Sequence, residues 1–165
     1  GFAFGTAVTT LYGQSLGAKR PDMAESFLKK TVFMGSVVMA FMTCILFFGS
    51  NVIMGFFTPD AEVISIGSTL LKILAIIQIP QLMAMCLTSA LQGAGDTKTP
   101  LYVTMLSMWG VRVLGVVIFV RILGFGITTL CICMCTDNVV RCILSFIFYL
   151  KKRKGIAKRA MEVNM

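Results

Sequence analysis

The chain has 165 residues, of which 57% are hydrophobic and 13% charged, and its formal net charge is +8. Soluble domains carry about 25% charged residues, so this chain has too few polar side chains to cover a soluble domain of its size. The composition excludes a soluble globular domain and leaves length for about five membrane spans.

The first apolar run covers residues 1–17 and contains no charged residue. As a helix it reaches about 25 Å, which is short of a hydrocarbon core of about 30 Å. No basic leader precedes it, so we expect the end of a span that begins elsewhere, not a signal peptide. Pro21 suits the first turn of a helix, so part of the basic connection 18–30 could be an amphipathic lead-in to the next helix.

The second apolar run, 31–57, is uncharged, and Pro59 and Asp60 mark a turn after it. The third run, 61–92, contains Pro80, which predicts a kink that frees backbone carbonyls near mid-depth. Gln78 and Gln81 flank this proline, and their amides could either bind the freed carbonyls or line a cleft.

The fourth and fifth runs cover residues 101–123 and 127–150, and a basic tail, 151–165, follows. None of the five runs shows the alternation over about ten residues that transmembrane barrel strands require. We therefore predict an all-α polytopic transmembrane bundle over residues 1–150, followed by the tail.

Loop charges predict the orientation of this bundle. Alternate loops and the tail share one side, and basic residues concentrate there, whereas the opposite side has Asp60, Glu62 and Arg121. The positive-inside rule places the basic side and the C-terminus in the cytoplasm. The net positive charge thus follows from topology and does not indicate a nucleic-acid partner. The basic residues of this side before the tail are Lys19, Arg20, Lys29, Lys30 and Lys98.

Three charged residues lie inside the last two runs at similar predicted depth: Arg112, Asp137 and Arg141. Asp137 and Arg141 are four residues apart and share a helix face. Because isolated charges are costly in a bilayer, we expect a paired cluster facing the bundle interior. It is either a structural ion pair between the last two spans or a lining of the ion or substrate path.

Nothing in the sequence indicates an enzyme, a metal site or a cofactor. There is no histidine and no phosphate-binding G-x-x-x-x-G-K-[ST] loop. The six cysteines all lie in apolar runs, and C-x-C-x-C at 131–135 does not have zinc spacing, so we expect packing residues.

Two glycine-rich strings give a more specific indication. The first, LQGAGDTKTP, ends at Pro100 and resembles the G-x-G-D-T-x-x-P signature of the multidrug and toxic compound extrusion (MATE) family. The second lies upstream and resembles the family's G-Q-x-L-G-A-x-x-x-x-x-A motif. A third string, MCTDNVVR, resembles a pattern in that family's final helix. The matching positions in the two glycine motifs are Gly13, Gln14, Leu16, Gly17, Ala18, Ala24, Gly93, Gly95, Asp96, Thr97 and Pro100.

The resemblance implies twelve helices in two bundles around a central cleft, with this chain supplying helices eight to twelve and a cytoplasmic tail. It implies a secondary antiporter of the plasma membrane, expected in the bacterial inner membrane, that exports organic and often cationic compounds in exchange for Na⁺ or H⁺. A missing N-terminal bundle would be its partner. The tenth-helix stretch has no carboxylate here, so coupling is expected to rest on carboxylates of the missing half.

Two alternatives stay open at this stage. A lipid-linked oligosaccharide or polysaccharide flippase of related fold would show more basic residues facing the cleft, and only Arg112 and Arg141 qualify. A non-transporting five-span scaffold would bind partners and would need no second bundle.

Overall fold

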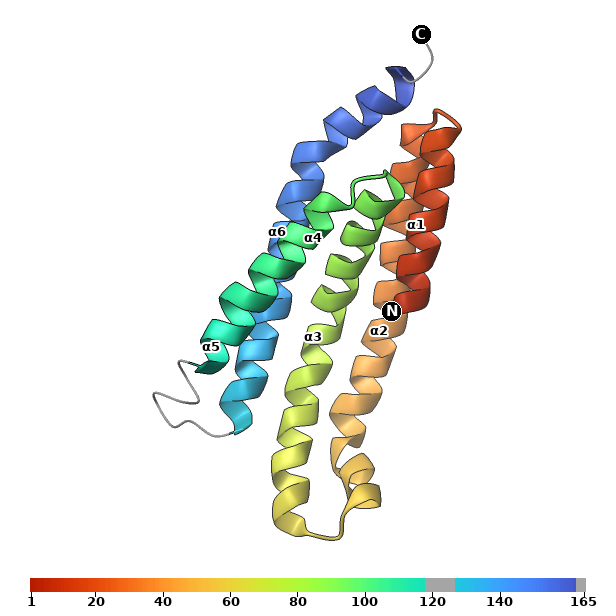
Figure 1. Cartoon of the computed structure of the whole chain (residues 1–165). Helices are drawn as coiled ribbons and strands as arrows, with labels where there is room; N and C mark the ends of the chain where they lie inside the picture. The colour runs from red at the N-terminus through yellow and green to blue at the C-terminus, as the bar shows by residue number, and fades with distance from the viewer. Residues whose placement is uncertain (118–126, 163–165) are drawn as a thin grey trace.

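The computed structural model describes residues 1–117 and 127–162, and Arg121, predicted to face the outer side, lies outside them. The predicted all-α fold is confirmed, since the described residues form helices joined by short turns (Figure 1). In chain order the elements are α1 (Phe2–Gly17), α2 (Pro21–Phe57), α3 (Ala61–Gly93), α4 (Lys98–Ser107), the π-helix η1 (Met108–Val113), α5 (Leu114–Val116) and α6 (Ile127–Glu162).

Three helices are long and apolar enough to cross a bilayer: α2, α3 and the Cys133–Arg153 part of α6. The first predicted span corresponds to α1, which has 16 residues. The fourth corresponds to α4, η1 and α5, and its predicted end lies beyond the described residues. The helices run alternately up and down, so the α1–α2 turn, the α3–α4 turn and the end of α6 share one end of the molecule (Figure 1).

Two helices extend further than the apolar runs. α2 begins at Pro21 because proline suits the first helical turn and Asp22 complements the helix dipole, so the lead-in and the span are one helix of 37 residues. α6 continues to Glu162, so no helix end separates the bundle from the basic residues after position 150. α3 is continuous through Pro80.

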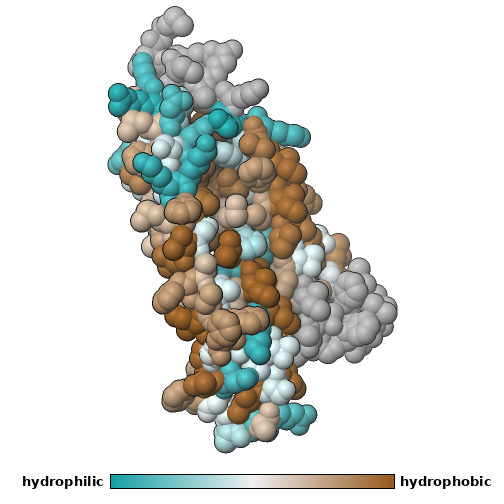
Figure 2. Space-filling view, turned by 180° about the vertical axis from the view of Figure 1, so that it is seen from behind, coloured by the Kyte–Doolittle hydropathy of each residue, from teal (hydrophilic) through white to brown (hydrophobic). Residues whose placement is uncertain are grey.

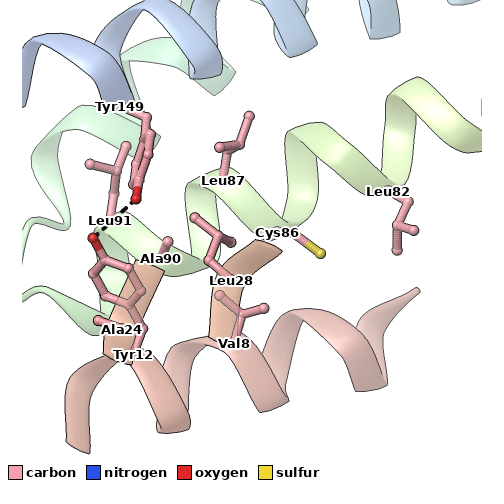
Figure 3. Close-up of a cluster of buried hydrophobic side chains, with 10 residues drawn as sticks. All are labelled: Val8, Tyr12, Ala24, Leu28, Leu82, Cys86, Leu87, Ala90, Leu91 and Tyr149. Atoms are coloured by element: carbon pink, nitrogen blue, oxygen red, sulfur yellow. Dashed lines mark hydrogen bonds between the residues drawn. The ribbon is translucent and has the colours of Figure 1, made fainter. Parts of the chain in front are cut away.

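The buried core lies toward the end that carries the α1–α2 and α3–α4 turns. Val8 of α1, Leu28 of α2 and Leu87 of α3 meet there (Figure 3). The Tyr12 hydroxyl lies 3.3 Å from that of Tyr149 in α6, and this buried hydrogen bond joins the first helix to the last.

The outer surface has the polarity expected of a membrane protein. Large apolar side chains cover α2, with Phe33, Phe41 and Phe48 exposed by 71%, 64% and 84%. Hydrophilic residues gather at the end where the two turns lie, and apolar residues form most of the surface below them (Figure 2). This pattern is consistent with a lipid-facing belt and a polar rim.

Candidate functional site

The two glycine-rich strings form two turns of the same construction. After α1, the Arg20 and Lys19 amides donate to the carbonyls of Ser15 and Leu16 at 2.9 and 3.0 Å. After α3, the Asp96 and Gly95 amides donate to Leu91 and Gln92 at 3.0 and 2.9 Å. This paired pattern closes a helix when one residue adopts a left-handed conformation. That residue is Gly95 (φ 79°) in the second turn and Lys19 (φ 58°) in the first.

The helices that lead into these turns approach closely because the facing residues are small. A Cβ added to Gly93 would lie 2.5 Å from the Thr9 carbonyl oxygen, and one added to Gly5 would lie 3.0 Å from Ser89 Oγ. The Thr9 hydroxyl also donates to the Ser89 carbonyl at 3.3 Å. Small residues and interhelical hydrogen bonds are what hold helices together in lipid, where apolar side chains gain little by associating.

Asp96 organises the second turn. Its carboxylate accepts the Thr99 amide at 3.3 Å and the Thr99 hydroxyl at 2.7 Å, so it binds the first turn of α4 from the residue before the N-cap, Thr97. Lys152 of α6 donates to the same carboxylate at 2.6 Å. Partial burial alone would raise the pKa of Asp96, but the hydrogen bonds from Lys152 and Thr99 outweigh it, and the pKa lies below its ordinary value.

A cavity of about 350 Å³ lies among α2, α3, α6 and the first two residues of the sequence, Gly1 and Phe2. Gln78, Gln81 and Asn138 place amide groups on its wall, and Met39 and Met85 supply flexible apolar surface. The described lining has no charged side chain. The sequence does not single out Asn138, because an uncharged amide next to the charged Asp137 in the MCTDNVVR string is no sign of a cavity.

Asp137 is buried, and two residues bind its carboxylate. The Ser107 hydroxyl donates to it and to the Asp137 carbonyl, and Arg141 Nη2 lies 3.8 Å from Oδ2. Among the described residues, Arg141 Nε and Ser145 Oγ are buried without a hydrogen-bond partner. The carboxylate is thus held by one hydroxyl and one guanidinium of the same chain.

The structure brings Asp137 and Arg141 together but leaves Arg112 apart. Within the described ranges, no hydrogen bond or ion pair joins Arg112 to either residue. Arg112 lies in η1, a π-helical segment that starts one residue after Ser107. The sequence missed Ser107 because a single serine in an apolar run is a common helix residue.

Comparison with known proteins identifies the family. A family model described as MatE matches residues 1–118. The chain is 29% identical over 87% of its length to an "Uncharacterized transporter YisQ" of Bacillus subtilis, covering 32% of that protein. It is 36% identical over 65% of its length to a "Probable multidrug resistance protein NorM" of Mannheimia succiniciproducens, covering 23% of that protein. It therefore spans about a third or less of these relatives. The chain belongs to the MatE family and is a multi-pass membrane protein.

Proposed function

We propose that the chain forms one wall of a secondary active exporter that moves organic, often cationic, compounds out of the cell in exchange for Na⁺ or H⁺. The match to MatE over residues 1–118 carries this proposal. It is supported by the name of the Mannheimia succiniciproducens relative, a probable multidrug resistance protein. Alternating access requires two bundles that move against each other around a site between them, so a second bundle supplies the opposing wall.

The cavity supports a role in substrate contact. Mostly apolar pockets with a few convergent polar groups are typical of small-molecule sites. Here the polar groups are the amides of Gln78, Gln81 and Asn138, and methionine side chains adapt to differently shaped compounds. Such a wall would bind the apolar body of a drug while leaving its positive charge to acidic groups of the other bundle.

Coupling to an ion places a further demand on that second bundle. Asp137 is bound by Ser107 and Arg141. Arg141 therefore balances the charge of this carboxylate within the chain, as paired groups in membrane bundles usually do. We therefore assign the coupling carboxylate to residues outside this chain.

The orientation is also part of the proposal. Lys19, Lys98 and Lys151 are exposed at the end that carries the two turns, and the positive-inside rule places such residues in the cytoplasm. A single cysteine at exposed Thr97 should react with an impermeant thiol reagent from the inside only. Thr99 is unsuitable for this test because it is buried. Labelling of Thr97→Cys from outside intact cells would contradict the orientation.

Drug accumulation in cells tests the transport role. In a host without its own efflux pumps, the protein as its gene encodes it should lower ethidium accumulation and raise drug tolerance. Gln81→Leu should change the relative export of different drugs, because it removes an amide from the cavity wall. Asn51→Leu is the matched control, since Asn51 is exposed near the far end of α2 and does not line the cavity. Unchanged accumulation on expression of the protein would refute the proposal.

A further inference from the structure

The last turns of α6 carry four contacting residues at helical spacing. Tyr149, Lys152, Arg153 and Ile156 fall at i, i+3, i+4 and i+7, so they share one face of the helix. This face lies beyond the apolar centre of the span, at the end of the molecule where both turns lie (Figure 1). The sequence suggested only a basic tail from residue 151 onward.

Each residue of this face touches a different part of the bundle. The Tyr149 hydroxyl meets that of Tyr12 in α1, and their ring centroids are 6.4 Å apart in an edge-on arrangement (Figure 3). Lys152 Nζ binds Asp96 Oδ2 at 2.6 Å and Thr99 Oγ1 at 2.5 Å in the α3–α4 turn.

The remaining two contacts complete the set. Arg153 Nε pairs with Glu25 Oε1 in the second turn of α2. Ile156 packs against the buried core cluster. The face therefore reaches α1, α2 and the α3–α4 turn together. It contacts Asp96 within one glycine-rich motif and Tyr12 in the helix that leads into the other.

The energies of the individual ion pairs do not explain this arrangement as a source of stability. The Lys152 and Arg153 side chains are 45% and 46% exposed, and exposed ion pairs contribute little each. Their geometry is more informative, because the partners lie 53 to 137 residues away along the chain. Such contacts fix where several helix ends lie relative to α6.

We infer that this face of α6 is a strut that makes α1, α2 and the α3–α4 turn move with α6 as one body during transport. Lys152 and Arg153 are then positioning residues. The inference rests on the proposed function, since alternating access moves one bundle against the other and requires each to keep its shape. A strut stays closed through the cycle, whereas a latch at the same place would open in each turnover.

Cross-linking distinguishes a strut from a latch. The native cysteines of the full-length protein would first be replaced. Glu25→Cys and Arg153→Cys would then be introduced and joined by a short bifunctional thiol reagent. If the face is a strut, cross-linking should change the ethidium efflux rate by less than about twofold relative to the uncross-linked pair. Such a change is no larger than the effect of losing one exposed ion pair. Loss of efflux on cross-linking, with recovery when a cleavable linker is cut, would overturn the inference.

Thiol accessibility tests the strut without any transport assay. Ser15→Cys places a reporter in a buried position near the end of α1. Lys152→Gln with Arg153→Gln should raise its maleimide labelling rate by roughly fivefold, the effect of losing about 1 kcal/mol of local closure. Lys29→Gln with Lys30→Gln is the matched control, because it removes the same charge from exposed residues for which the described chain shows no ion pair.

Charge exchange provides the rescue. Glu25→Arg with Arg153→Glu rebuilds the pair with opposite polarity and should return the labelling rate to the wild-type value, whereas Arg153→Glu alone should not. Equal labelling in the wild type, the Lys152→Gln/Arg153→Gln variant and the control would overturn the strut even if the protein exports drugs. Failure of export with the expected labelling pattern would refute the proposed function and leave the rigid connection established.

Discussion

Gly13 of α1 and Gly93 of α3 lie so close that a Cβ added to Gly13 would stand 3.0 Å from the Gly93 carbonyl oxygen. Each glycine belongs to a different family motif, so the motifs are neighbours in space as well as landmarks in the sequence. Their shared requirement is backbone proximity, which any side chain at these positions would disturb.

Gly93→Ala should destabilise the protein by about 1–3 kcal/mol, the usual cost of forcing an atom into a packed interface. The added methyl group would meet the Thr9 backbone at 2.5 Å, and backbone cannot rotate away. Melting in detergent, followed by size-exclusion chromatography, measures the effect. Gly17→Ala is the control because it meets nothing within 4 Å. Equal melting temperatures for the two variants would show that α1 and α3 do not approach as described.

Lys19→Gly should stabilise the protein by up to about 1 kcal/mol. Lys19 has φ 58°, a conformation that costs a side-chain-bearing residue about 1–2 kcal/mol, although glycine also gains freedom in the unfolded chain. Arg20→Gly is the control, since Arg20 has φ −119° and gains no such relief. A melting temperature that falls in Lys19→Gly would mean that the first turn does not have the left-handed form.

The contact between Asp96 and Lys152 should depend on pH in the acid range only. Because the pKa of Asp96 in the folded protein lies below its ordinary value of 3.8, the carboxylate stabilises the fold above that pH. The contribution is lost as the pH falls through the lowered pKa.

Asp96→Asn keeps a capping oxygen for Thr99 but removes the charge that Lys152 binds. The wild type should therefore melt at a higher temperature than this variant at pH 7, and the difference should shrink below pH 4 or so as the carboxylate protonates. A difference that is constant from neutral to acid pH would exclude the carboxylate charge as its cause.

Asp137→Asn should reduce the yield of folded protein more than Lys72→Gln. Breaking a buried ion pair costs about 3–5 kcal/mol, whereas the contact that the described residues show for Lys72 is with the Phe47 ring, 5.9 Å from its centroid. Adding Arg141→Gln should recover part of the yield by removing the unpaired charge. Fluorescence-detected chromatography of solubilised membranes measures each variant. Wild-type yield from Asp137→Asn alone would show that the pair contributes nothing.

The fold class could be predicted from the sequence because a segment can span a bilayer only as a helix or as a strand of a closed barrel. Helix ends were less predictable: α2 starts at Pro21 because the basic lead-in continues the same helix, and hydrophobicity alone marks only where the apolar part begins. The i, i+4 spacing of Asp137 and Arg141 indicated their pairing, since it depends on one helix.

Contacts between distant segments could not be read from the sequence in the same way. The Ser107 hydroxyl on Asp137 and the approach of Gly93 to Thr9 depend on how α4 and α1 pack against their neighbours. Arg112 and Asp137 have similar predicted depth, yet no hydrogen bond or ion pair joins them in the described part of the chain, because depth fixes only one coordinate of a side chain. The pairing of Lys152 with Asp96 depends on the continuation of α6 past the membrane span, and hydrophobicity does not predict that continuation.

Gradient-driven export from proteoliposomes is the most direct test of the transport proposal. The purified protein, as its gene encodes it, would be reconstituted with ethidium and given an imposed Na⁺ or H⁺ gradient without ATP. We expect ethidium movement that follows one of the two gradients and stops when the matching ionophore dissipates it. Movement that is the same with and without both gradients, or that requires ATP, would contradict a secondary antiporter.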